Sequence, residues 1–384
     1  MLKKYILTPG PTPVPEKVLL EMAKPIVHHR TDDFSSIMSE AKGKLKKIFG
    51  TANDVIILSG SGTAAMESAM VNTLSSGDKV LIVNGGKFGK RWVDIANIYK
   101  LNVILIDLKW GESLKSEDLE KKLKEHKDIK AVLMQSSETS TTVYHPVEEI
   151  AKVLSEEEDI ILIVDGITSV GVYDTRMDEW GIDVLITGSQ KALMLPPGLA
   201  FISLSERAQR HMEHSNLPKY YLDFKKEMKM QKLNRTAYTP AVSMIMGLNV
   251  ALGMLLEEGL QNVYKRHALC AHATREAVKS LGFTLLCEDV PSNAVTGFYL
   301  PEEMEGRGFL KYMREKAGII FSGGQDYLEG KVLRISHLGY HGGFDTIIAI
   351  SALEMGMKKF GVDVQLGKGV RMAETILFEN MDIV

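Results

Sequence analysis

Short apolar runs recur along the first half of the chain, and each one ends in glycine or small polar residues. Runs of this length bounded by turn-forming residues predict β-strands that are buried on both faces. The predicted strands cover residues 55–58, 80–83, 103–107, 131–135, 160–164 and 183–187. Helical patterns lie between them, at residues 34–49, 64–74 and 116–126 among others. Alternating strands and helices predict an α/β fold with a mostly parallel sheet covered by helices.

The pattern changes near residue 260, where strands and helices alternate less regularly. Strands are expected at residues 284–286, 295–300 and 331–337, with helices at residues 263–280, 309–316 and 344–359. This predicts a smaller α+β domain. We therefore divide the chain into an extended, proline-rich arm (1–15), a large domain (16–258) and a small C-terminal domain (259–384), with no structure assigned to residues 361–384.

The composition argues against several kinds of binding partner, namely nucleic acid, membranes and metal ions. The 384 residues include 46 Lys and Arg against 49 Asp and Glu, so the net charge is −3 and no basic surface for nucleic acid is expected. No apolar run has transmembrane length, and the charged, proline-broken start does not resemble a signal peptide. The two cysteines, Cys270 and Cys287, form no disulfide framework or metal motif. We expect a cytoplasmic protein without membrane, nucleic-acid or metal partners.

Two charged residues end neighbouring predicted strands. Asp165 follows strand 160–164, and Lys191 follows strand 183–187 shortly before a Pro-Pro-Gly turn. Both strand ends can meet at one edge of the sheet, where α/β proteins bind ligands. A partly desolvated lysine is a nucleophile toward carbonyls, and an aspartate paired to a pyridinium nitrogen is the second requirement of pyridoxal chemistry. An ordinary exposed loop lysine is the alternative.

Two further features suggest binding of anions. The glycine-rich turn 59–63 lies between a strand and a helix, which directs backbone N–H groups at a phosphate, although such turns are common. It lacks the lysine of a nucleotide-binding P-loop. Arg334 lies in the middle of an apolar strand, where an arginine needs a partner. A structural ion pair stays open for Arg334.

The motif Thr187-Gly188-Ser189-Gln190-Lys191, with Pro197-Gly198, resembles the cofactor-lysine motif of class V aminotransferases. The most similar members are the alanine–glyoxylate and serine–pyruvate aminotransferases, and the resemblance extends from Pro9-Gly10-Pro11 to about Phe360. It implies the type I, aspartate-aminotransferase-like fold and pyridoxal 5′-phosphate as cofactor. It also implies amino transfer from alanine or serine to glyoxylate or pyruvate by a homodimer with a shared active site. Aspartate as donor, and a cysteine desulfurase-like lyase, are the alternatives.

The resemblance also assigns residues. Lys191 and Asp165 are the expected catalytic residues, and Arg334 and Gly10 are expected at the substrate. The expected cofactor contacts are Ser61, Gly62, Thr63, Phe88, Thr139, Asp165, Gln190 and Lys191, with Ser189 helping and with Thr239 contributed across the dimer. Phe88, on the segment after strand 80–83, departs from the Trp common in close relatives. The contributions of Arg30 and Thr236 stay open.

Overall fold

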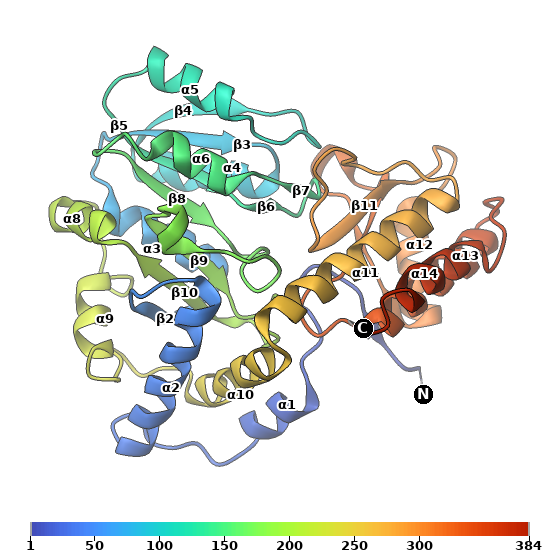
Figure 1. Ribbon diagram of the computed structural model, residues 1–384, viewed down its shortest axis with the longest axis horizontal. Helices are drawn as coiled ribbons and strands as arrows, with labels where there is room; N and C mark the ends of the chain where they lie inside the picture. Colours follow the sequence, from blue (N-terminus) through green and yellow to red (C-terminus); the bar gives the residue numbers. More distant parts are fainter. Residues whose placement is uncertain (1, 383–384) are drawn as a thin grey trace.

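A seven-stranded sheet forms the centre of the large domain. The computed structural model describes residues 2–382, and its ribbon is shown in Figure 1. In spatial order the strands are β2 (Val55–Gly60), β10 (Gly198–Leu204), β9 (Val184–Gly188), β8 (Ile161–Asp165), β5 (Ile129–Gln135), β3 (Lys79–Asn84) and β4 (Asn102–Asp107). Only β10 runs antiparallel to its neighbours. The mostly parallel sheet predicted from the apolar runs is confirmed.

Both faces of this sheet are buried, as the continuous apolar runs require. Within β8, Leu162 and Val164 belong to one core and Ile163 to the other. The core containing Leu162 is shared with helices α1 (Glu16–Met22), α2 (Asp32–Phe49), α5 (Ser116–Glu125), α6 (Val147–Leu154) and α10 (Val242–Glu258). The core containing Ile163 is shared with α3 (Gly62–Thr73), α4 (Lys87–Ile98), α8 (Glu206–His214) and α9 (Phe224–Gln231). The large domain therefore has three layers.

The small domain has its own hydrophobic core around a three-stranded antiparallel sheet. The strands are β11 (Val295–Tyr299), β14 (Val332–Ser336) and β13 (Ser322–Gly323). The helices are α11 (Leu260–Ser280), α12 (Gly306–Tyr312), α13 (Gly343–Lys359) and α14 (Lys368–Phe378), with a π-helical turn at Met313–Ala317 and a 3-10 turn at Asp326–Leu328. The N-terminal arm joins this domain, because β1 (Tyr5–Ile6) pairs with β12 (Ile319–Ile320).

The structure differs from the sequence-based expectations in several elements. Residues 284–286 form only a single bridge, between Leu285 and Phe298, rather than a strand. The segment after β3 is the start of helix α4 and not a loop. Strand β10, directly after the Pro-Pro-Gly turn, and helix α14, within residues 361–384, were not predicted. The short elements β6 (Ser137–Glu138), β7 (Val143–Tyr144) and α7 (Met177–Trp180) complete the fold.

No single helix within residues 2–382 is long and apolar enough to cross a bilayer. Helices α10 and α11 reach that length and composition only together, as a pair bent by 84°.

Candidate active site

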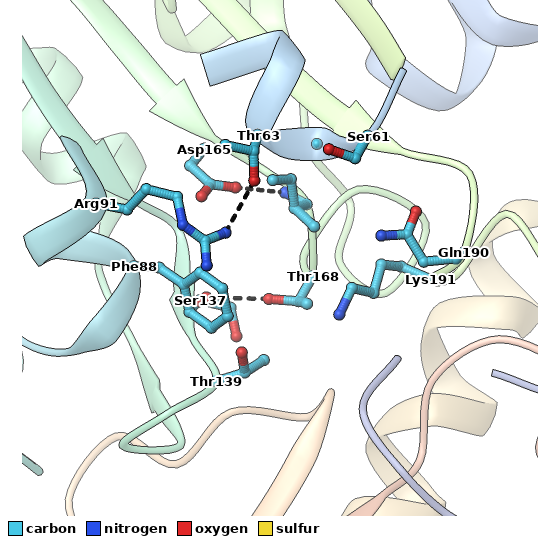
Figure 2. Close-up of a pocket in the computed structure, with 12 residues that line it drawn as sticks. Ser61, Thr63, Phe88, Arg91, Ser137, Thr139, Asp165, Thr168, Gln190 and Lys191 are labelled. Carbon is cyan, nitrogen blue, oxygen red and sulfur yellow. Dashed lines mark hydrogen bonds between the residues drawn. The ribbon is translucent and has the colours of Figure 1, made fainter. Parts of the chain in front are cut away.

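A cavity opens at the carboxyl ends of the parallel strands (Figure 2). It is lined by Ser61, Gly62, Thr63, Phe88, Arg91, Ser137, Thr139, Asp165, Ile167, Thr168, Gln190 and Lys191. These residues come from segments up to 130 positions apart (191 − 61) and meet because their strands end at one edge of the sheet. All but one of the predicted same-subunit cofactor contacts therefore lie together; the exception is Ser189.

Lys191 lies on the loop between β9 and β10 and directs its amine into the cavity (Figure 2). Burial lowers the pKa of this amine to about 8, although the charge of Asp165 opposes the shift. The Nζ atom donates a hydrogen bond of 2.6 Å to the carbonyl of Pro9 in the N-terminal arm. A Cβ at Gly10 would overlap the end of the Lys191 side chain. The arm therefore borders the reactive amine, which places Gly10 beside it.

Asp165 ends β8, next to the strand that leads to Lys191. Its side chain is 5% exposed, and Oδ1 accepts one hydrogen bond of 2.8 Å from the backbone N–H of Ile167. Burial raises the pKa of this carboxyl to about 7. Because the carboxylate accepts only this one hydrogen bond from the described residues, it can accept another from a ligand in the cavity.

The turn between β2 and α3 forms the side of the cavity nearest Gln190. Ser61 occupies the N-cap position of α3, where backbone N–H groups have no partners within the helix. A Cβ at Gly62 would overlap the side chain of Ile167, so only glycine leaves this space open. The buried Oε1 of Gln190 has no hydrogen-bond partner among residues 2–382. The free backbone N–H groups at this turn suit a ligand with an anionic group.

Arg91 lines the cavity and was not predicted. Its Nη1 donates a hydrogen bond of 3.1 Å to Oγ1 of Thr63, and its guanidinium carbon lies 4.8 Å from the centre of the Phe88 ring. Residues three apart share one face of a helix, so Phe88 and Arg91 both reach the cavity from α4. Had the segment been predicted as a helix, this spacing would have identified Arg91.

Arg334, on β14, approaches from the small domain. It is 6% exposed; its Nε donates to the carbonyl of Gly323 (2.9 Å) and its Nη1 to the carbonyl of Thr139 (2.7 Å). Burial lowers the pKa of the guanidinium to about 10, which leaves it a cation at neutral pH. No acidic side chain of the described residues forms an ion pair with Arg334, and its Nη2 makes no hydrogen bond to them. The geometry therefore leaves one charged donor for a ligand.

The remaining residues considered from the sequence lie elsewhere. The Ser189 hydroxyl donates to the carbonyl of Pro196 (2.7 Å) inside its own loop, and Ser189 does not line the cavity, so its help in cofactor binding stays a prediction. Thr239 and Arg30 are exposed and do not line the cavity of their own subunit. Thr236 is buried and donates to the carbonyl of Tyr238 (2.6 Å).

Comparisons with known proteins agree with this geometry. The family model described as Aminotransferase class-V matches residues 4–341. The chain is 39% identical over 378 residues to the soluble hydrogenase 42 kDa subunit of Anabaena cylindrica, covering 97% of this chain and 98% of that protein. It is 35% identical over 375 residues to the L-aspartate–glyoxylate aminotransferase of Paracoccus denitrificans (96% and 95% covered). It is also 35% identical over 390 residues to the serine–glyoxylate aminotransferase of Methylorubrum extorquens (98% and 97% covered).

Two solved structures are similar over nearly the whole chain. The ureidoglycine–glyoxylate aminotransferase from Bacillus subtilis has a TM-score of 0.93 at 29% sequence identity, with 99% of each chain covered. The alanine–glyoxylate aminotransferase from Nostoc sp. has a TM-score of 0.88 at 29% identity, with 93% of this chain and 96% of that chain covered.

Proposed function

The chain belongs to the class V aminotransferases, whose cofactor is pyridoxal phosphate, and we propose that it moves an amino group from a small amino acid to glyoxylate. Serine and alanine are the proposed donors, and pyruvate is a second candidate acceptor. The observation that carries the proposal is one cavity lined by Lys191 and Asp165, with Arg334 of the other domain hydrogen-bonded to the lining residue Thr139. Glyoxylate also recurs in the names of relatives with different donors.

The cavity residues fit pyridoxal phosphate. The backbone N–H groups of the turn at Ser61 and Gly62, and the Nε2 donor of the Gln190 amide, would hold the phosphate. The Phe88 ring would stack on the pyridine ring, and the Asp165 carboxylate would accept its N–H. When bound, the cofactor supplies an electron-accepting ring that weakens the bond from the substrate Cα to hydrogen.

Two side chains of the protein, Lys191 and Arg334, would do the remaining work of proton transfer and substrate binding. Lys191 is the attachment point, because its lowered pKa makes a neutral, nucleophilic amine available near neutral pH. With the cofactor bound, Nζ of Lys191 would be the base that takes the proton from the substrate Cα and holds it for return. Arg334 would bind the α-carboxylate that amino acids and 2-oxo acids share, which orients both substrates alike.

Aspartate is the second candidate donor, because a relative with 35% identity is named an L-aspartate–glyoxylate aminotransferase. Arg30, the weak candidate for a distal carboxylate, is exposed and outside the cavity. A desulfurase-like reaction needs an accessible thiolate. Both Cys270 and Cys287 are buried, and burial raises the pKa of the Cys270 thiol to about 11.

A donor and acceptor screen tests the proposal. Purified holoenzyme is incubated with serine, alanine, aspartate or cysteine against glyoxylate, pyruvate or 2-oxoglutarate, and both products are quantified. We expect the highest kcat/KM for serine or alanine with glyoxylate. Sulfide release from cysteine without amino transfer, or no transfer from any pair, would contradict the proposal.

The proposal includes a homodimer whose two subunits share each site. Thr239 is exposed and lies outside the cavity of its own subunit, which leaves its hydroxyl available to a partner. Light scattering tests the dimer, and Thr239→Ala should weaken cofactor binding if this hydroxyl reaches the partner's phosphate. A cytoplasmic location stays a prediction that cell fractionation can test.

A further inference from the structure

Directly behind the cavity lies a buried carboxylate that no step of the proposed reaction uses. Glu138 is completely buried, and its Oε2 accepts hydrogen bonds of 3.0 Å from the backbone N–H groups of both Phe88 and Gly89. Its Oε1 accepts from the backbone N–H of Ser140 at 3.1 Å and also from the Ser140 hydroxyl. All four contacts are donors, and an ionised carboxylate is the form that can accept from all of them.

These contacts place the carboxylate at the N-terminus of α4. The first N–H groups of a helix lack partners within it, and an anion there is favoured by the helix dipole. No side chain from the adjoining sequence caps α4; Glu138 supplies this contact from 50 residues further along the chain (138 − 88). The orientation of the first turn, and of the Phe88 ring on it, therefore depends on Glu138.

The same residue also adjoins the substrate side of the cavity. The next residue, Thr139, lines the cavity, and its carbonyl accepts the hydrogen bond from Nη1 of Arg334. Glu138, Thr139 and Ser140 thus form one short segment that holds the helix carrying Phe88 and also anchors Arg334. A displacement of this segment would move both binding groups together.

We propose that Glu138 is a positioning residue that fixes the Phe88 ring against the cofactor and, through Thr139, the Arg334 guanidinium against the substrate. This inference rests on the proposed function for the identity of the two ligands. The inference extends the proposed function to Glu138, whose side chain would contact neither the cofactor nor the substrate.

The chain offers a matched control for this assignment. Glu354 is also a buried carboxylate, 2% exposed, and it also caps a helix N-terminus, at α14 in the small domain. It accepts hydrogen bonds from the backbone N–H groups of Gly367 (2.6 Å), Gly369 (2.7 Å) and Val370 (3.1 Å). The two glutamates make the same kind of contact, but Glu354 contacts no residue of the cavity.

The test compares Glu138→Gln with Glu354→Gln in the full-length protein. Pyridoxal phosphate binding to the apoprotein is titrated by absorbance and near-UV circular dichroism, and thermal unfolding is recorded in parallel. We expect both variants to melt earlier but only Glu138→Gln to raise the cofactor Kd, by about tenfold, and to lower kcat/KM about 10- to 100-fold. An equal rise of Kd in both variants, or earlier melting of Glu138→Gln with unchanged Kd and spectrum, would overturn the assignment.

Two additions keep the test decisive. If Glu138→Gln does not fold, Ser140→Ala removes one donor to the carboxylate, and with it the acceptor of the Lys87 backbone N–H, and should give a smaller change of the same kind; no change in Kd would then refute the proposal. In a double-mutant cycle, the effects of Glu138→Gln and Phe88→Ala on Kd should be clearly less than additive. Full additivity would show that Glu138 does not act through Phe88. These binding readouts hold even if the donor screen finds no amino transfer.

Discussion

The two domains contribute differently to the cavity. The large-domain side consists of strand ends and tight turns, with Asp165 at the end of β8 and Lys191 on the loop after the adjacent parallel strand β9. The small domain approaches the cavity through one arginine, Arg334, which does not line it but donates to two backbone carbonyls, one of which belongs to the lining residue Thr139 of the large domain. The difference suggests that cofactor binding belongs to one domain while substrate binding depends on how the two domains meet. The Lys191 and Asp165 variants below should affect the cofactor side and the Arg334 variants the kinetics with substrate, whereas the pH prediction tests whether the two sides interact.

The largest effect is expected from Lys191→Ala on the large-domain side. The variant lacks the amine that binds the cofactor covalently, so transamination should fall below detection. Borohydride reduction followed by mass spectrometry should find no cofactor attached to the protein. Lys90→Ala, which removes an exposed lysine on α4, is the control and should behave as wild type. Cofactor fixed to another lysine in Lys191→Ala would contradict the assignment.

Asp165→Asn should reduce kcat about 10²- to 10⁴-fold, the range of a well-placed proton-transfer or charge-stabilising group. The amide keeps the size of the side chain but removes the charge that would stabilise a protonated ring nitrogen. Cofactor should still bind through the turn at Ser61 and Gly62, with an altered absorbance spectrum. Near-normal turnover would show that another group meets this requirement.

Arg334→Ala should reduce kcat/KM by tens to thousands of fold, since losing one partner of a buried charge pair costs about 2–5 kcal/mol. Arg334→Lys keeps the charge but loses the planar pair of donors, so KM should rise for every amino and oxo acid tested. The cofactor spectrum should stay unchanged in both variants. Normal kinetics combined with early melting would make Arg334 a structural residue instead.

The smallest effect concerns pH and tests whether the two sides interact. Only the neutral amine of Lys191 attacks the cofactor aldehyde, and its pKa is lowered to about 8. Below that pH the neutral fraction falls about tenfold per unit, so stopped-flow capture of pyridoxal phosphate should speed up with pH and level off above about 8. Burial is the main cause of the shift, and the Arg334 cation adds to it. Arg334→Ala should therefore move the plateau to higher pH. An unmoved plateau would mean that the charge of Arg334 does not influence the pKa of Lys191.

The sequence predicted those parts of the fold and site that depend on the local pattern of apolar residues. Asp165 and Lys191 could be placed together because continuous apolar runs predict parallel strands and parallel strands end at one edge. The start of α4 could not be predicted in this way. Its glycines, Gly85, Gly86 and Gly89, favour a turn, and the group that caps the helix is Glu138, which is distant in sequence.

Three other elements were predicted wrongly or not at all, because they also depend on contacts between segments distant in sequence. The apolar residues of β10 follow Pro196-Pro197-Gly198, which we interpreted only as a turn, and the strand is stabilised by pairing with β2 and β9. Helix α14 depends on Glu354 and on packing against α11 and α13. The segment expected as a strand at residues 284–286 pairs with β11 at one bridge only, so its apolar pattern did not extend into a full strand. Tertiary contacts decided all three elements.

The pairing of β2 with β10 has a consequence for biosynthesis. In this pair Gly60 lies opposite Gly198, a separation of 138 residues (198 − 60) that includes every other strand of the sheet. Closing so long a loop is slow, and on the ribosome it must wait until β10 has emerged. The turn at Ser61 therefore stays without its neighbouring strand until the segment carrying Lys191 has already been synthesised. Nascent chains that end before Leu204 should remain sensitive to protease and unable to retain pyridoxal phosphate, so cofactor capture cannot precede completion of the seven-stranded sheet.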